Sequence, residues 1–383
     1  MRSRLLLLVG AAVLLASATI LHDTASAAEP QTEAANAAVQ YIEGLQNSDG
    51  GFPSFGSDSA PGSTIDAVFA LKAAGVDPAT VTNGGNSPID YLSSQAATYA
   101  QDPGGLAKLI LCVRLVNLDV TSFGGVNLLS EIDGHFDDAT GTFGEDVFDQ
   151  TLFVLAGETF QQSPQATRLA AAIEHLRSVQ QADGGWEFSA GAGSDSNTTA
   201  MALQALAAAG DGAGSATITN GVAYLHSVQN DDGGFAFAPG SDSDPDSTAL
   251  VIQALVAAGE NIDANGPWDR GGHTPLAALL SFRNAATGAF QFGGEDSAFA
   301  TYQAVPALML APFPDLRTRI VAAPTPTPQP TVIAVTPTAT PRVALPDAGG
   351  APGENDGPWW LIAALSAGGA AIAAGGAVAR RAR

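Results

Sequence analysis

The chain has 383 residues, and its 38 acidic against 15 basic residues give a formal net charge of −23 at pH 7. A chain this acidic repels nucleic acid and anionic lipid surfaces, so we expect no nucleic-acid partner. Its single cysteine, Cys112, cannot form an intramolecular disulfide, so the fold must rest on an apolar core.

Residues 1–27 have the features of a secretory signal peptide. Arg2 and Arg4 give a positive start, an apolar run follows, and Ala25-Ser26-Ala27 is a small-residue cleavage site. An uncleaved membrane anchor is the alternative. The sequence therefore predicts an exported protein whose folded part lies on the extracytoplasmic side of the membrane.

Residues 28–316 contain one short phrase three times, Gln-[Gln/Asn]-x-Asp-Gly-Gly-[Phe/Trp]. Weaker copies at 102–106, 138–143 and 286–290 suggest six units of roughly 48 residues, and a period of that length indicates a repeat architecture. Asp-Gly-Gly favours a chain turn, which the aromatic residue then pins against its neighbours. The residues expected to hold these turns are Gln46, Asp49, Phe52, Gln180, Asp183, Trp186, Gln229, Asp232 and Phe235.

Each phrase lies between two helical patterns of different character. Before it the apolar residues follow one helix face, as in Ile173, Leu176 and Val179. After it comes a Ser/Thr-rich start and a nearly all-apolar run, such as residues 200–209, which predicts a buried helix ending at glycine. Six such pairs predict an all-α closed double ring with the buried helices inside. An open solenoid is the alternative, and it would need polar end repeats.

The repeated phrase and the inner helix after it resemble the prenyltransferase/squalene cyclase repeat, over about residues 30–315. The resemblance implies an (α/α)6 toroid, but it does not imply one activity. Relatives include terpene cyclases, protein prenyltransferase β subunits, cobalamin carriers and thioester domains. The zinc ligands of the prenyltransferases and the Gly-Cys-Gly-Glu-Gln loop of the thioester domains are absent from this sequence.

One segment resembles a catalytic motif of that family. Asp244-Pro245-Asp246-Ser247-Thr248-Ala249 is similar to the Asp-x-Asp-Asp-Thr-Ala motif of class II terpene cyclases, with Ser247 in place of the third Asp. The resemblance assigns the general acid to Asp246 and makes Asp244 its companion. A cyclase also needs an aromatic-lined cavity, because aromatic faces stabilise carbocations.

Acidic residues recur between the turn phrase and the inner helix, where a ring would gather them at one end. Their oxygens would suit Ca²⁺, a sugar or a cationic ligand, and no other cofactor is evident. The alternative is that they cap helices and shape loops. Glutamines at similar positions of the inner helices are either ligand contacts or hydrogen bonds between helices. The candidate ligand-binding residues are Asp58, Asp146, Asp195, Asp242, Asp296, Gln204, Gln253 and Gln303.

The C-terminal part predicts a stalk and an anchor. Residues 317–357 form a Pro/Thr-rich linker, 358–380 an apolar segment long enough to span a membrane, and 381–383 a basic cytoplasmic tail. Leu345-Pro346-Asp347-Ala348-Gly349 with the segments after it resembles a sortase sorting signal, which has Thr in place of Ala348. Sortase linkage to the cell wall and a plain membrane anchor are therefore both open.

These features predict a membrane-anchored surface module that binds a small apolar ligand or a protein or glycan partner. The alternative is an enzyme, either cyclase-like or active on polysaccharides, that uses rim carboxylates with Asp246 as general acid. An aromatic-lined cavity of several hundred Å³ would favour an enzyme or a lipid binder, whereas a barrel filled by side chains would favour a scaffold. The oligomeric state is not predicted.

Overall fold

The structure is a computed structural model that describes residues 30–160 and 165–316. The predicted signal peptide (1–27), linker (317–357), transmembrane segment (358–380) and basic tail (381–383) lie outside the described residues. Within the described ranges, no helix is both long enough and apolar enough to cross a membrane.

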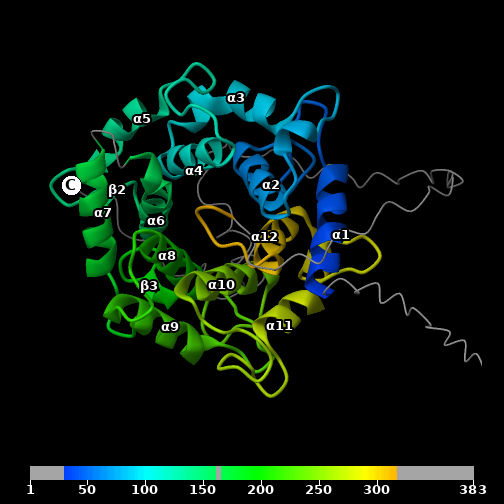
Figure 1. Ribbon diagram of the computed structural model, residues 1–383, viewed down its shortest axis with the longest axis vertical. Helices are drawn as coiled ribbons and strands as arrows, with labels where there is room; N and C mark the ends of the chain where they lie inside the picture. The colour runs from blue at the N-terminus through cyan, green and yellow to red at the C-terminus, as the bar shows by residue number, and fades with distance from the viewer. Residues whose placement is uncertain (1–29, 161–164, 317–383) are drawn as a thin grey trace, which may run out of the picture.

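The described chain forms two concentric rings of α-helices (Figure 1). The outer ring contains α1 (Pro30–Gly44), α3 (Pro88–Tyr99), α5 (Leu128–Glu131), α7 (Ala166–Ser178), α9 (Ala216–Val228) and α11 (Pro275–Ser281). The inner ring contains α2 (Pro61–Ala73), α4 (Pro103–Leu115), α6 (Val147–Leu155), α8 (Ser196–Ala208), α10 (Pro245–Ala258) and α12 (Ala298–Leu308). This α/α toroid confirms the predicted fold class.

The ring closes between its first and last helix pairs. The inner helix α12 packs against both α1 and α2. The Tyr302 hydroxyl donates a hydrogen bond to the Pro53 carbonyl at 3.1 Å, and the Tyr302 ring meets the edge of Phe52 with centroids 6.2 Å apart. The prediction of a closed ring is therefore confirmed, and the open solenoid is excluded.

The inner helices are more deeply buried than the outer helices, as the apolar patterns predict. The inner helices α8 and α10 are buried on every side over most of their length, whereas α7 buries only Ala172 and Leu176. Gly75 and Gly210 follow α2 and α8 with positive φ, and Gly259 caps α10 in the left-handed region. Glycine stops these helices because it adopts that conformation at little cost.

The three strong copies of the turn phrase make the same contacts. In the middle copy, the Gln180 side chain donates to the carbonyls of Gly184 and Thr217 at 2.8 and 3.0 Å. Asp183 accepts from the Gly185 N–H at 3.0 Å and from the Ser194 hydroxyl at 2.8 Å. Equivalent bonds are made by Gln46, Asp49, Gln229 and Asp232, and the aromatics Phe52, Trp186 and Phe235 are fully buried.

Short antiparallel hairpins lie at three of the turns. They pair β1 (Phe136–Asp137) with β2 (Thr142–Phe143), β3 (Trp186–Glu187) with β4 (Ser194–Asp195), and β5 (Phe290–Phe292) with β6 (Glu295–Ser297). In the second hairpin Trp186 lies opposite Asp195. The 3₁₀ helices are η1 (Pro78–Thr80), η2 (Ile132–Gly134) and η3 (Ala156–Thr159).

The prediction for the second unit is wrong in its location. Residues 102–106 do not form a turn after an outer helix but begin the inner helix α4. Asp102 caps that helix by accepting the Gly105 N–H at 2.6 Å, and Pro103 occupies the first helical position. Leu106 is thus an inner-helix residue. The α2, α8 and α10 helices also start earlier than their Ser/Thr pairs, at caps Ala60, Asp195 and Asp244.

Candidate functional site

A repeated hydrogen bond orients the inner helices. In five of the six inner helices of the described chain, a side chain four residues after the N-cap accepts the backbone N–H of the buried aromatic before it. The bonds are Phe52 to Thr64 (2.9 Å), Phe143 to Gln150 (2.6 Å), Trp186 to Thr199 (2.9 Å), Phe235 to Thr248 (3.0 Å) and Phe290 to Thr301 (2.9 Å). Because each acceptor points back to its turn, each bond restricts rotation of its helix about the helix axis.

This orientation turns two other positions of every inner helix towards the lumen, namely those two and six residues after the N-cap. The first set forms what we call the mouth layer: Gly62, Gly104, Phe148, Asn197, Asp246 and Phe299. The second set, one turn deeper, forms the floor layer: Asp66, Lys108, Leu152, Met201, Leu250 and Gln303. All of these residues line one or both of two adjoining cavities.

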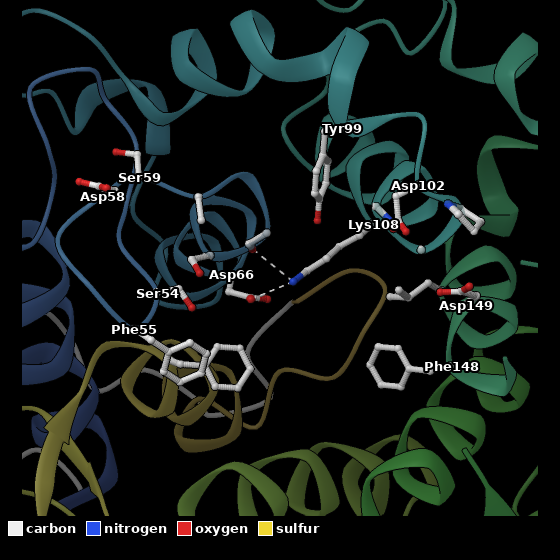
Figure 2. A pocket seen from close by; sticks show the side chains of 18 of the residues that line it. Ser54, Phe55, Asp58, Ser59, Asp66, Tyr99, Asp102, Lys108, Phe148 and Asp149 are labelled. Carbon is white, nitrogen blue, oxygen red and sulfur yellow. Dashed lines mark hydrogen bonds and ion pairs between the residues drawn. The ribbon is translucent and has the colours of Figure 1, made fainter. Parts of the chain in front are cut away.

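The larger cavity has a volume of about 340 Å³ and opens at the N-terminal ends of the inner helices (Figure 2). Its aromatic lining consists of Phe55, Tyr99, Phe148 and Phe299. The smaller cavity, of about 50 Å³, lies deeper and includes the wall formed by Asp246. The predicted aromatic-lined cavity is therefore present, and the barrel is not filled by side chains at its mouth.

The last described residues close the floor of the lumen, where they run across the centre of the ring (orange in Figure 1). The Phe313 N–H donates to the Gln204 side chain at 3.0 Å, and the Phe313 ring meets Phe69 edge-on with centroids 5.0 Å apart. Arg114 holds the same segment by donating to the Pro314 carbonyl at 3.0 Å. Within the described chain, this segment therefore covers the end of the lumen opposite the mouth.

An ion pair crosses the floor layer. Figure 2 shows Lys108 extending from α4 to Asp66 on α2, where its ammonium lies 2.8 Å from the carboxylate and 3.2 Å from the Gly62 carbonyl. Burial raises the pKa of Asp66, and the Lys108 charge opposes that rise. Lys108 is the one basic side chain among the residues that line the larger cavity. The carboxylates there are Asp58, Asp66, Asp102, Glu145, Asp146 and Asp149.

The two motif carboxylates have different surroundings. Asp244 caps α10, accepting the Ser247 N–H at 2.7 Å and the Ser247 hydroxyl at 2.8 Å. Asp246 belongs to the mouth layer, is 7% exposed, and has one carboxyl oxygen without a hydrogen-bond partner in the described chain. Burial and the charges of Asp244 and Asp66 hold the pKa of Asp246 well above its usual range. Asp246 therefore favours its protonated form more than an exposed aspartate does, which is the direction that a general acid requires.

Most of the other predicted acidic residues act as caps or loop residues. Asp146 and Asp195 cap α6 and α8, and burial raises the pKa of both, that of Asp195 to about 6. Asp58 and Asp146 line the larger cavity, Asp242 is exposed, and Asp296 accepts hydrogen bonds from Asn284 and Gln291. Among the described residues, no three His, Cys, Asp or Glu side chains are placed to hold a metal ion. Calcium binding at this rim stays a prediction.

The three predicted glutamines also differ in role. Gln204 binds the backbone of the floor segment, so it is structural. Gln303 belongs to the floor layer and lines the deeper cavity. Gln253 is fully buried, and neither atom of its amide has a hydrogen-bond partner in the described chain. Of the three, Gln303 is the one that lines a cavity, and its role as a ligand contact stays a prediction.

Among the charged residues of the cavity, sequence reasoning missed Asp66, Lys108 and Asp149. Asp66 and Lys108 were detectable, because each is a charged residue inside an otherwise apolar inner-helix run. Asp149, in the first turn of α6, lines the larger cavity and accepts the Glu145 N–H at 3.0 Å. Burial and the nearby charge of Asp146 raise the pKa of Asp149 to about 7. Its burial depends on tertiary packing that local patterns do not show.

Two family models match the chain. The squalene-hopene cyclase C-terminal domain matches residues 135–262, and the prenyltransferase alpha-alpha toroid domain matches residues 10–105. These matches confirm the resemblance to prenyltransferase/squalene cyclase toroids that the repeated phrase predicts.

Solved structures share the toroid. The type II terpene cyclase MstE from Scytonema is 16% identical with a TM-score of 0.54, covering 73% of this chain and 97% of its own. A protein from Actinoplanes is 12% identical (TM-score 0.53, 73% and 99% covered). The unsaturated glucuronyl hydrolase from Bacillus sp. GL1 is 13% identical (TM-score 0.51, 73% and 96% covered). At these identities the likeness shows the fold alone. No curated protein matches.

Proposed function

We propose that the toroid binds a small ligand in its lumen, with an apolar body against the aromatic wall and a cationic or hydroxyl-bearing end towards the carboxylates. The observation that carries this is the cavity of about 340 Å³ at the mouth, which combines both kinds of wall in one space. Its volume lies within the range of small-molecule sites, roughly 300–1,000 Å³.

The aromatic wall suits the body of the ligand. Phe148 and Phe299 enter the lumen from α6 and α12, and Phe55 on the mouth loop lies 6.3 Å from Phe299 between ring centroids. Phe55 is 56% exposed, which is unusual for a large apolar side chain in this molecule. A ligand seated here would cover part of that exposed ring, which favours binding.

The carboxylates suit the other end of the ligand. Lys108 is already paired with Asp66, so it offers little charge to an anionic ligand. Asp58, Asp102 and Asp149 also line the cavity. The described lining residues include no cation other than Lys108 that could pair with them. An ammonium group gains both from these charges and from the faces of nearby aromatic rings. We therefore expect cations to bind better than anions of the same shape.

Three probes that share an unbranched eight-carbon skeleton test this preference for cations: octylamine, octanol and octanoate. Their binding is measured by calorimetric titration. The amine is expected to bind most tightly and octanoate most weakly. Phe148→Ala is expected to weaken amine binding at least fivefold, whereas Leu118→Ala, at a 44% exposed position outside the cavity lining, leaves it unchanged. Absence of binding by all three probes contradicts the proposal, and equal affinity for octylamine and octanoate contradicts its charge component.

A second candidate function is acid catalysis by Asp246 on an unsaturated ligand, and the burial of Asp246 on the lumen wall with its raised pKa favours it. The carboxyl O–H would break as its proton forms a C–H bond with one alkene carbon, leaving a carbocation. Loss of a proton from a neighbouring carbon back to the Asp246 carboxylate would restore the acid and yield an isomer of the same mass. Phe148 and Phe299 lie in the same layer and would stabilise the cation. The similarity to a type II terpene cyclase supports this candidate through fold alone.

Farnesol, which has three alkenes and no charge, is a suitable probe for this reaction. Incubation followed by gas chromatography with mass detection is expected to show isomers of unchanged mass. Asp246→Asn is expected to abolish them, because an amide cannot donate a proton of that acidity. The matched control Asp242→Asn changes an exposed residue and is expected to retain them. Isomers formed equally by Asp246→Asn would rule out this role.

We also propose that the protein is exported and held at the cell surface by its C-terminal segment. The support is the signal-like residues 1–27 and the apolar segment 358–380 followed by basic residues. Cell fractionation with external protease tests it. The chain is expected in the membrane or cell-wall fraction and accessible to protease in intact cells, and recovery from the cytosol contradicts it.

A further inference from the structure

We infer that Gly62 sets the size of the ligand that the lumen accepts, together with Gly104 beside it; this rests on the proposed ligand binding. Four of the six mouth-layer positions carry a side chain into the lumen: Phe148, Asn197, Asp246 and Phe299. The two neighbouring helices α2 and α4 carry glycine there. The larger cavity is lined by both glycines and lies on this side of the ring.

The backbone does not require glycine at either position. Neither Gly62 nor Gly104 has a positive φ, and both lie in the first turn of a regular helix. Glycine is a poorer helix former than alanine, so its presence at two equivalent lumen positions needs another reason. The space that each glycine leaves provides that reason, and the space differs between the two.

At Gly104 the space is occupied by a neighbouring carboxyl. A Cβ atom there would lie 2.2 Å from the Oδ1 atom of Asp149, so a larger residue would displace that carboxyl from the cavity wall. Gly104 therefore admits Asp149 to the site. This position is unsuitable for a test of ligand size, because a substitution would change two features at once.

At Gly62 the space is open except towards Tyr99, whose hydroxyl would have to shift by a few tenths of an ångström. Outside its own helix, the one heavy atom within 4 Å of a Cβ there would be the Tyr99 hydroxyl oxygen, at 3.2 Å. Gly62 also lies one helical turn above Asp66, and its carbonyl accepts a hydrogen bond from Lys108 at 3.2 Å. A side chain at position 62 would stand in the cavity above this ion pair. It would shorten the space available to a ligand without moving the backbone.

The test begins without ligand, by comparing Gly62→Leu with Gly221→Leu in the full chain. Gly221 is also helical and lacks a positive φ, but a Cβ there would lie 2.8 Å from Leu203 Cδ2 and 3.0 Å from Trp186 Cζ3. We expect the melting temperature of Gly62→Leu to equal or exceed that of the unchanged protein, and that of Gly221→Leu to fall by several degrees. Equal losses in both variants overturn the inference, because position 62 would then be packed.

The ligand readout uses unbranched primary amines from butylamine to decylamine. Affinity of the unchanged protein is expected to rise with chain length. Gly62→Leu is expected to bind octylamine and decylamine at least tenfold more weakly while retaining butylamine, with Gly62→Ala between the two. If the unchanged protein binds the amines, but its affinity depends on amine chain length in the same way as that of Gly62→Leu, this inference alone is overturned. An unchanged protein that binds no amine overturns the proposed function and this inference with it.

Discussion

Thr248 accepts the backbone N–H of Phe235 at 3.0 Å, and this bond connects the turn after α9 to the first turn of α10. Asp246 lies two residues before Thr248, on the face of α10 that lines the lumen. The same contact recurs on α2, α8 and α12 through Thr64, Thr199 and Thr301. One hydroxyl per helix therefore helps to decide which side chains face the ligand cavity.

Replacing Thr248 by valine keeps the shape of the side chain and removes this acceptor. The Phe235 N–H would be left buried without its partner, which costs about 1–3 kcal/mol of the free energy of unfolding. Thr219→Val is the matched control, because Thr219 is exposed on α9 and bonds only to carbonyls of nearby residues. Urea denaturation measures both variants. A Thr248→Val loss no larger than that of Thr219→Val would mean that the contact does not hold the helix.

Trp186→Ala is expected to destabilise the protein by at least about 3 kcal/mol. The Trp186 side chain is fully buried, and its indole N–H donates to the Leu176 carbonyl at 2.8 Å, so the substitution leaves both a cavity and an unpaired carbonyl. Phe55→Ala removes an exposed aromatic and is the control. Thermal melting compares the two, and an unchanged melting temperature for Trp186→Ala contradicts the assigned role.

Much of the fold was predictable because independent local signals agreed. Gln180, Asp183 and Trp186 and their counterparts each predicted a turn, and the apolar patterns on both sides predicted an outer and an inner helix. The error at residues 102–106 arose because Asp-Pro-Gly-Gly also makes a good helix start. Aspartate caps a helix and proline suits its first position, so the same four residues are compatible with a turn and with a helix start.

The candidate site was predictable only where a motif marked it. Asp246 was found by its resemblance to a catalytic motif, and the structure places it on the lumen wall. The two lumen layers could not be read from the sequence, since they depend on how each helix is rotated. That rotation is set by bonds such as Trp186 to Thr199, which join different elements. Asp149 was missed for the same reason, because its burial comes from packing against α4.

Lys108→Met is expected to destabilise the protein by up to about 3 kcal/mol at pH 8, because it leaves the buried Asp66 carboxylate without its cation. The loss should be smaller at pH 5, since the pKa of Asp66 would rise further and its carboxyl would take up a proton. The double variant Lys108→Met/Asp66→Leu should recover most of the stability. Additive losses in the double variant, measured by urea denaturation, would show that the two residues act independently.

The stability of the protein is expected to fall between about pH 5 and pH 8. The folded state holds the pKa of Asp149 at about 7 and that of Asp195 at about 6, both above the ordinary 3.8. The contribution of these two groups to the free energy of unfolding is fully present below about pH 3.8. It is lost as pH rises through their folded-state pKa values, because the native state binds the protons more strongly than the unfolded state does.

Asp149→Asn should flatten this pH dependence. Hydrogen bonds from Thr121 lower the pKa of the exposed Asp119, so Asp119→Asn should alter the pH dependence of stability only in acid and leave the slope between pH 5 and pH 8 unchanged. Melting temperatures across that range test both variants. If Asp149→Asn leaves the slope of stability against pH unchanged, other groups cause the pH dependence.

A crystal structure of the protein soaked with octylamine tests the lumen site most directly. We expect electron density for the alkyl chain between Phe148 and Phe299, with its ammonium group within hydrogen-bonding distance of a cavity carboxylate and away from Lys108. Phe148→Ala crystals under the same conditions should lack that density. Density that lies only on the outer surface of the ring, with the cavity holding no amine at saturating concentration, would contradict this expectation.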